Sequence, residues 1–394
     1  MKRLLSLLLV LALALPFAAF AENDEELDIE VIVEDVDLDE ADSVPADAAP
    51  LPPELQAELA SSLESKDYVP TELDNNNLYI NPNLPGNVIN ILLLGVDTRN
   101  AELIENDVKL ADVQMILSYN YDTGAIKLSS ILRDTLVVNP NTGKNRPINE
   151  SYQSYDAKNI FHDNPQRSVA TVNYNFEMNI QYYVTINFHG VAAIIDTIGG
   201  VDVDLTKGEA WNINYYIKKN GSRIGRTYGT GQSHPALEVK DGVQHLDGIQ
   251  ALMYARLRKS LSSKYDMGGD WQRTVRTRHL MDLLLQKVLK MGAMDLLDLV
   301  GTAVEYINSN MNVNTMADLV LQVLRSGITE KLGKSDSLIE QFRIPMGDAE
   351  TGDKTWSYDP DSGKIFMSRN NGNFQKNIEG LHEFIYGKYY PANP

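Results

Sequence analysis

The feature that most constrains the fold is a run of nine residues, 88–96 (VINILLLGV), in which Asn90 alone is polar. The run ends directly at Asp97. A strand that is apolar on both sides is typical of a sheet covered by other layers on both faces, and nine residues are too few to span a membrane as a helix. The run therefore predicts an interior strand of an α/β domain.

The segments that follow alternate between strand patterns and helix patterns. Residues 125–132 (AIKLSSIL) and 182–188 (YYVTINF) have strand character, whereas 190–197, 248–258 and 273–291 have apolar residues at helical spacing. Strands that alternate with helices are typical of sheets with helices packed on them. The predicted fold is a three-layer α/β/α sandwich with a mixed central sheet.

Composition agrees with a soluble domain and narrows the range of functions. The 394 residues are 43% hydrophobic and 23% charged, which suits a sizeable core. Acidic residues outnumber basic ones by 54 to 35, and a net charge of −19 argues against nucleic acid as a partner. The chain has no cysteine, so disulfides, thiolate nucleophiles and cysteine-bound metals are excluded.

Residues 1–21 have the pattern of a secretory signal peptide. Lys2 and Arg3 precede an apolar stretch, Pro16 interrupts it, and small residues allow cleavage after Ala21. The alternative is an uncleaved membrane anchor, since the stretch has about the minimum length for a span. Either way we expect an extracytoplasmic protein, secreted to the cell wall or held at the outer face of the membrane.

A strongly acidic segment follows the signal. Residues 22–65 hold 16 acidic residues and no Lys or Arg, and they include a stretch rich in Pro and Ala. Like charges repel one another and little apolar surface is available for burial, so we expect a disordered linker over 22–85. A more specific role, as a cation buffer or a spacer through a cell wall, stays open.

Charged residues follow two of the predicted strands. Asp97 and Arg99 stand after the first (GVDTR), and Arg133 and Asp134 after the second (ILRDT), while Asp112 opens a third apolar segment. In open α/β sheets, ligands bind beyond the carboxyl ends of strands. We therefore expect these side chains to contribute to one site.

A second set of charged residues lies further along the chain. YARLR supplies Arg256 and Arg258, and DWQRTVRTR supplies Asp270, Arg273 and Arg276, the last two on one helix face. Guanidinium groups bind phosphate oxygens in bidentate fashion, and carboxylates hold Mg²⁺. Several arginines near a few carboxylates would suit a pyrophosphate with a bound divalent cation.

In these residues the chain resembles the LytR-CpsA-Psr family. The resemblance spans about residues 86–330, which implies a catalytic domain there and a C-terminal extension, 331–394, packed on it. It implies an extracytoplasmic enzyme that moves a glycopolymer from a polyprenyl-pyrophosphate carrier to peptidoglycan, forming a phosphodiester with Mg²⁺ (or Mn²⁺). The segments that carry it are INILLLGVDTR, ADVQMILSYNYDTGAIKLSSILRDT, RPINESY, YYVTINFHGVAAIIDTIGGVDVDL, LDGIQALMYARLRKS and DWQRTVRTR.

The resemblance also assigns roles residue by residue. Asp97 and Asp112 match the acids near the metal. Asn149 matches an Asn that helps position the donor, although a helix cap would explain it equally well. Thr277 stands where the family usually has Gln, directly after the RxxR pair. The residues that match catalytic or phosphate-binding positions are Arg99, Arg133, Asp134, Arg256, Arg258, Arg273 and Arg276, with Asp270 in the same motif.

Two functions remain open from the sequence. In the first, an enzyme uses Asp97 or Asp134 as the base, and Asp134 is preferred because a metal ligand is a poor base; with water as acceptor the same site is a pyrophosphatase. In the second, a non-catalytic protein binds polyprenyl-phosphate lipids or glycopolymers, a reading that Thr277 favours. Both have a lipid-linked partner at the membrane surface.

Overall fold

The computed structural model describes residues 73–96, 110–153, 164–227, 234–257 and 372–392, with shorter stretches and single residues between 264 and 367. The predicted signal peptide and the acidic segment lie outside these residues. None of the helices in the described ranges is long and apolar enough to cross a membrane.

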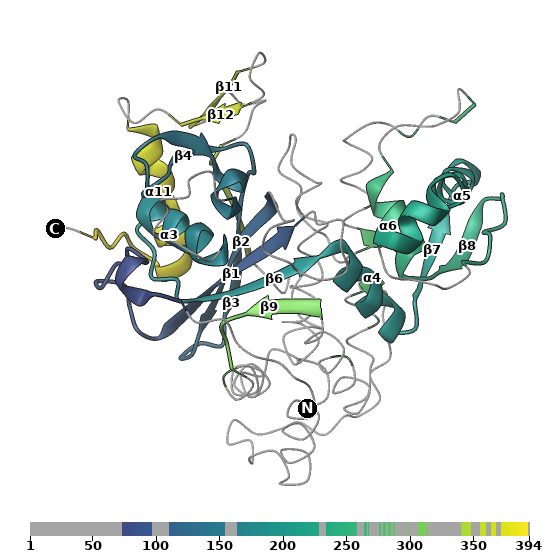
Figure 1. Cartoon of the computed structure of the whole chain (residues 1–394). Coiled ribbons are helices and arrows are strands. Elements are labelled where there is room, and N and C mark those ends of the chain that lie inside the picture. The colour runs from purple at the N-terminus through teal and green to yellow at the C-terminus, as the bar shows by residue number, and fades with distance from the viewer. Residues whose placement is uncertain are drawn as a thin grey trace, which may run out of the picture.

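A six-stranded mixed sheet forms the centre of the molecule (Figure 1). Strand β2 is antiparallel to both of its neighbours, β1 and β3, whereas β6 runs parallel to β1 and β10 parallel to β3. The α/β class and the mixed sheet predicted from the sequence are thus confirmed. In spatial order the strands are β10 (Glu340–Ile344), β3 (Ile126–Ile131), β2 (Ala111–Asn120), β1 (Val88–Val96), β6 (Tyr182–Asn187) and β9 (Ile307–Ser309).

Both faces of the sheet are buried. Leu92 and Leu94 point to one face, where they share a core with α3 (Asn164–Phe176) and α11 (Asn373–Tyr386). These two helices lie beside each other on the sheet, with the rings of Phe176 and Phe374 stacked at 5.8 Å (Figure 1). The opposite face carries Ile91, Leu93, Met115 and Leu117, all nearly inaccessible. Burial on both sides explains why the β1 segment is apolar at every position except Asn90.

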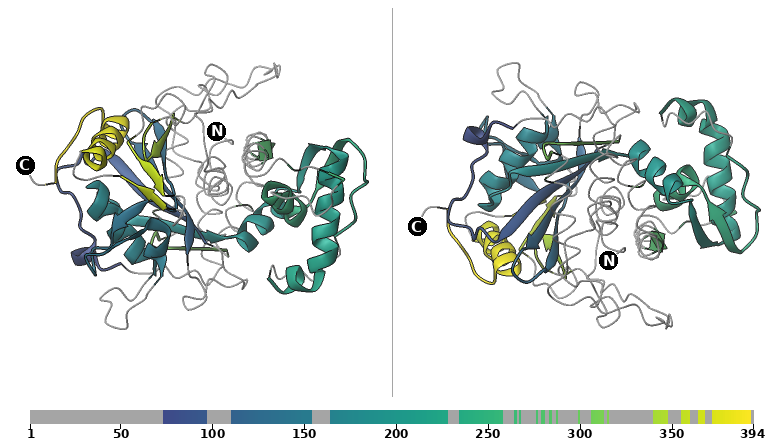
Figure 2. Two further views of the ribbon diagram at one scale, coloured as in Figure 1. Left: turned by 90° about the horizontal axis from the view of Figure 1, so that it is seen from above. Right: turned by 90° about the horizontal axis from the view of Figure 1, so that it is seen from below.

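A second core lies beyond the end of β6. Helix α4 (Phe188–Thr197) follows β6 directly and packs on α6 (Gly248–Arg256), next to α5 (Lys207–Thr227) and the hairpin of β7 (Val201–Leu205) and β8 (Gly242–Leu246). Figures 1 and 2 show this group at one side of the molecule, away from α3 and α11. Gly248 permits the close approach of α6 to α4, because a Cβ there would lie 2.0 Å from the carbonyl oxygen of Ala192.

Short elements complete the described structure. They border the sheet on the side of α3 and at the ends of its strands (Figure 1). They are the 3₁₀ helices η1 (Asn75–Asn77) and η2 (Ile148–Tyr152), and the hairpins β4 (Leu136–Val138) with β5 (Asn145–Pro147) and β11 (Ser357–Asp359) with β12 (Lys364–Phe366).

The domain extends past both predicted boundaries. Leu78, which the sequence analysis assigned to the linker, is fully buried in the core with α3 and α11. Asn81 is also buried, and its amide donates to the carbonyl oxygens of Glu177 and Tyr390. At the other end, β10 is a strand of the central sheet and not part of an appended extension. The linker therefore ends before Leu78, and residues after 330 belong to the domain.

Candidate active site

Strand directions gather several chain segments at one edge of the sheet. The carboxyl ends of β1, β3, β6 and β10 lie there, and the antiparallel β2 begins there. Asp112 stands at the start of β2, and Arg133 and Asp134 follow β3. The strand directions therefore place these three residues at one edge of the sheet, which is the arrangement that the sequence predicts.

Asp112 lies at a β-bulge. Along the β1–β2 ladder Gly95 pairs with Val113 and Val96 pairs with Ala111, so Asp112 is an extra residue in β2. A bulge bends the strand and changes the direction of its side chain. The Asp112 side chain is 21% exposed, which leaves its carboxylate partly accessible at the sheet edge.

Arg133 and Asp134 are the central residues of a tight turn after β3. The Thr135 amide donates to the carbonyl oxygen of Leu132 at 3.0 Å, which closes the turn. The Leu132 amide in turn donates to Ile344 on β10, and the Ile365 amide donates to the Asp134 carbonyl oxygen. The turn is held from both sides, so its two charged side chains project from a fixed backbone.

These charged groups contact each other. Arg133 Nε donates to Asp134 Oδ2 at 3.2 Å, and Arg133 Nη1 lies 3.9 Å from Asp112 Oδ1. The Arg133 and Asp134 side chains are 42% and 38% exposed. One guanidinium thus lies between two carboxylates at a surface that a solute can reach.

Asn149 joins the same group from the first turn of η2. Its side-chain amide donates to Asp112 Oδ1 at 3.3 Å, and its backbone amide donates to the carbonyl oxygen of Arg133 at 3.1 Å. Asn149 Oδ1 is buried and makes no hydrogen bond within the described residues. A buried acceptor without a donor is costly, so this oxygen suits a ligand or a cation. We call Asp112, Arg133, Asp134 and Asn149 the edge cluster.

Arg256 lies at the same sheet edge but further along it. It is the last residue of α6, and its guanidinium stacks over the ring of Phe188, 4.3 Å from the centroid. Phe188 directly follows β6. The strand order places β3, which Arg133 follows, three strand spacings, about 14 Å, from β6, which leads into Phe188; β2 and β1 lie between them.

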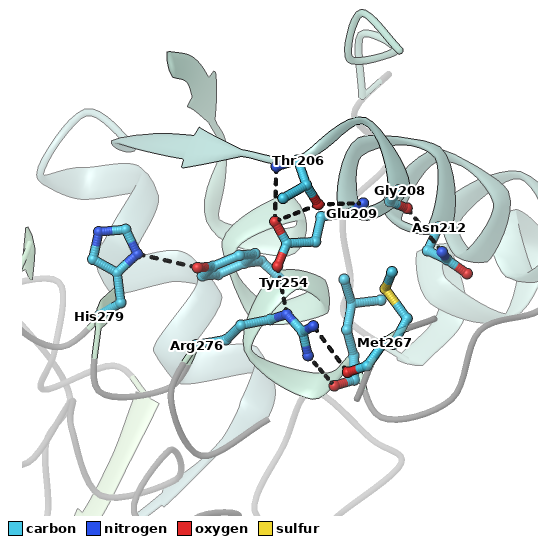
Figure 3. A network of polar contacts seen from close by, with 9 residues as sticks. Thr206, Gly208, Glu209, Asn212, Tyr254, Met267, Arg276 and His279 are labelled. Carbon is cyan, nitrogen blue, oxygen red and sulfur yellow. Dashed lines mark hydrogen bonds and ion pairs between the residues drawn. The ribbon is translucent and has the colours of Figure 1, made fainter. Parts of the chain in front are cut away.

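Arg276 is in a different environment. It is buried, and its Nε donates to Glu209 Oε1 at 2.6 Å while Nη1 and Nη2 donate to the carbonyl oxygens of Leu257 and Met267 (Figure 3). Arg273, the other arginine of the same sequence motif, lies outside the described residues. The environment of Arg276 favours a structural role over phosphate contact.

Two titratable side chains near Arg276 and Glu209 have shifted pKa values. Burial is the largest cause that raises the pKa of Tyr254, and burial likewise lowers the pKa of His279. His279 Nδ1 lies 3.1 Å from the Tyr254 hydroxyl (Figure 3), where a neutral imidazole accepts the hydroxyl hydrogen. Both groups are therefore favoured in their neutral forms.

The remaining predicted site residues lie outside the described part of the chain. They stay predictions. They are Asp97, Arg99, Arg258, Asp270, Arg273 and Thr277.

Glu209 is a charged residue of this region that the sequence analysis did not single out. It stands three residues after Thr206, at the start of α5. The pattern Thr-x-x-Glu before a helix is the signature of a capping box, so its place in the helix was predictable. Its partner Arg276, 67 residues away, was not.

Comparison with known proteins establishes the family. A model of the LytR_cpsA_psr family matches residues 57–373, and the protein therefore belongs to this family. The match begins before residue 78 and continues past residue 330, in agreement with the domain limits seen in the structure.

Several proteins are similar to the chain. It is 29% identical over 278 residues, 70% of this chain and 75% of the relative, to the polyisoprenyl-teichoic acid–peptidoglycan teichoic acid transferase TagU of Bacillus mycoides (strain KBAB4). It is 26% identical over 254 residues, 63% of this chain and 53% of the relative, to biofilm regulatory protein A of Streptococcus mutans. Among solved structures, TagV of B. subtilis is 20% identical with a TM-score of 0.48, covering 78% of this chain and all of TagV.

Proposed function

We propose that this protein transfers a glycopolymer from a polyprenyl-pyrophosphate carrier to a cell-wall acceptor such as peptidoglycan, outside the cytoplasm. Family membership and the relatives named as teichoic acid transferases support a transferase of the cell envelope. The observation that carries the proposal is the edge cluster, in which a half-exposed arginine lies between two carboxylates on a fixed turn.

Arg133 is suited to the donor pyrophosphate. A guanidinium presents planar N–H donors that match phosphate oxygens, and the exposed part of Arg133 is accessible to such a group. Arg256 offers a second guanidinium at the same sheet edge. Two arginines at this edge can contact different parts of a diphosphate and its first sugar. We propose that Arg258 and Arg273 also bind the donor pyrophosphate.

The proposed reaction is displacement of polyprenyl phosphate by a hydroxyl group of the acceptor. A hydroxyl oxygen of the acceptor attacks the phosphorus that carries the glycopolymer, forming a new P–O bond. The bond from that phosphorus to the bridging oxygen breaks, and polyprenyl phosphate leaves. The hydroxyl proton passes to Asp134, the more exposed carboxylate of the edge cluster. Arg133, next to this carboxylate, stabilises negative charge on the phosphoryl oxygens. Water in place of the hydroxyl would give hydrolysis.

A divalent cation fits the donor set of the edge cluster. Within the described residues no three His, Asp or Glu side chains are grouped to hold a metal ion, and the predicted ligand Asp97 lies outside them. Asp112 supplies a carboxylate and Asn149 Oδ1 an orphaned amide oxygen, both hard ligands of the kind that Mg²⁺ or Mn²⁺ takes. Such an ion would neutralise charge on the pyrophosphate.

Release of polyprenyl monophosphate tests the proposal. The purified protein is incubated with a polyprenyl-pyrophosphate-linked sugar and Mg²⁺, with and without EDTA. We expect release that EDTA abolishes and that Arg133→Ala and Arg256→Ala each reduce strongly. Tight donor binding with no release would instead support a non-catalytic lipid-binding protein.

Export is proposed on the sequence of residues 1–21. Mass spectrometry of the protein recovered from its producing cells separates cleavage after Ala21 from a retained anchor. A mature chain that starts at Glu22 is the expected result, and a full-length chain in the membrane fraction would contradict it.

A further inference from the structure

The guanidinium of Arg276 joins four segments of the chain (Figure 3). It reaches Glu209 on α5, the carbonyl oxygen of Leu257 after α6 and the carbonyl oxygen of Met267 at 2.6, 2.9 and 2.9 Å. The Arg276 and Glu209 side chains are 6% and 11% exposed. We call Glu209 and Arg276 the buried pair.

Glu209 is itself held in one position. Its Oε2 accepts hydrogen bonds from the Thr206 backbone amide and hydroxyl, each at 2.9 Å, and the Thr206 hydroxyl accepts the Glu209 amide at 3.2 Å. This capping box fixes the carboxylate at the first turn of α5. Since Oε1 faces Arg276, the carboxylate cannot move without loss of the helix start or of the pair.

The two carbonyl oxygens that Arg276 contacts belong to residues ten positions apart in the chain. Leu257 stands between Arg256 and Arg258 in the sequence, and Met267 closes the segment ten residues later. Leu257 directly follows Arg256, the last residue of α6, so a hydrogen bond that holds the Leu257 carbonyl restricts the backbone next to Arg256. We expect a shift of the Arg276 guanidinium to move this backbone and with it the Arg256 side chain.

We infer that Glu209 is a positioning residue for the phosphate-binding arginines, acting through Arg276 on the backbone at Leu257 and Met267. The inference rests on the proposed function, in which Arg256 and Arg258 contact the donor pyrophosphate. Glu209 touches neither donor nor acceptor. Its negative charge keeps the buried guanidinium in place, because Arg276 has no other carboxylate partner among the described residues.

If Arg276 bound the phosphate directly, loss of the Glu209 charge would change donor affinity in the opposite direction. If Arg276 contacted the pyrophosphate, removal of the negative charge of Glu209 would leave it more positive and strengthen donor binding. If Glu209 positions the arginines, the same change weakens donor binding. The sign of the change in affinity separates the two roles.

The test compares Glu209→Gln and Glu209→Asp with the unmodified protein. Donor KM, kcat and the dissociation constant for a polyprenyl-pyrophosphate-linked sugar are measured well below each variant's unfolding temperature. We expect Glu209→Gln to raise KM and Kd at least tenfold with a smaller change in kcat. Glu209→Asp keeps the charge but withdraws it by one methylene, so it should fold readily and raise KM about threefold.

Asn90→Ala is the matched control for lost stability. Asn90 is buried near the start of β1, where its side chain bonds Ser118, Asn179 and Tyr386, about 20 Å from the carboxyl end of that strand. We expect it to lower the unfolding temperature and leave donor KM unchanged. An equal rise of KM in Asn90→Ala, or an unchanged or lowered KM in a folded Glu209 variant, would overturn the inference.

Donor binding and turnover by the unmodified protein distinguish failure of this inference from failure of the proposed function. Binding of the donor without turnover would contradict the transferase and still allow the Kd comparison. A protein that neither binds nor converts the donor would contradict both.

Discussion

Two arginines of this protein each pair with carboxylate groups, and they differ in burial. Arg133 of the edge cluster is 42% exposed and lies between Asp112 and Asp134 on a turn. Arg276 of the buried pair is 6% exposed and donates to Glu209 and two carbonyl oxygens. An exposed pair contributes little to stability and can rearrange around a ligand, whereas a buried pair resists any change. We propose that Arg133 binds the substrate, whereas Arg276 fixes the backbone segments around it.

Arg276→Ala should have the largest effect on stability. Removal of the guanidinium leaves the Glu209 carboxylate buried without its cation, and the loss in the free energy of unfolding should be about 3–5 kcal/mol. Urea denaturation monitored by circular dichroism measures it. The double variant Glu209→Met with Arg276→Met should recover much of the loss, and a single variant within about 1 kcal/mol of the unmodified protein would refute this view of the pair.

Arg133→Ala should show the reverse pattern. We expect polyprenyl monophosphate release to fall by about 10²–10³-fold, the cost of losing one preorganised donor to a developing negative charge. The free energy of unfolding should change by less than about 1 kcal/mol, because the ion pairs of Arg133 are exposed. Lys127→Ala, at the opposite end of β3, is the charge-matched control and should keep normal release. Equal losses in the two variants would remove Arg133 from the site.

Asp112→Asn tests the oxygen donors of the edge cluster. The amide keeps the size of the side chain but loses its charge, so the Mg²⁺ concentration for half-maximal release should rise by about tenfold or more. Titration of release against Mg²⁺ measures this. Asp122→Asn, on the loop after β2 at the far end of the strand, serves as control. An unchanged Mg²⁺ requirement would exclude Asp112 as a metal ligand.

His279→Gln should have the smallest effect, on the pH dependence of stability. Burial lowers the pKa of His279, so below about pH 6.5 the unfolded chain binds a proton that the folded protein does not. Folding stability therefore falls as the pH drops from 6.5 towards the folded pKa, by less than about 1.4 kcal/mol per pH unit for one group.

The His279→Gln variant should flatten this slope. Unfolding temperatures between pH 7 and pH 5 are compared for the two proteins. Burial lowers the pKa of His382 in the same direction, so His382 contributes to the slope that remains. A variant with an unchanged slope would show that His279 does not titrate differently in the two states.

The sequence predicts the edge cluster better than the buried pair, for a physical reason. Residues at strand ends meet because strand direction places them at one sheet edge, so Asp112, Arg133 and Asp134 could be grouped from the pattern alone. The bulge that adds Asp112 to β2 has no sequence signal, since it depends on how β1 and β2 are paired.

The buried pair illustrates where sequence reasoning fails. The spacing of Arg273 and Arg276 indicates a shared helix face, but burial of Arg276 is decided by Glu209, Leu257 and Met267, which the fold brings together from distant positions. The short strand β10 was missed similarly. Its five residues, EQFRI, alternate weakly, and its pairing with β3 depends on a partner more than 200 residues earlier.

We propose that the protein catalyses transfer and not hydrolysis, and the fate of the phosphorus atom distinguishes the two reactions. The protein is incubated with Mg²⁺, a peptidoglycan acceptor and a donor carrying ³²P in the phosphoryl group attached to the sugar. We expect label to enter the acceptor as a phosphodiester and polyprenyl monophosphate to appear in equal amount, and we expect Arg133→Ala to reduce both by about 10²–10³-fold. Label found solely as sugar phosphate in solution, or retained on the lipid, would contradict it.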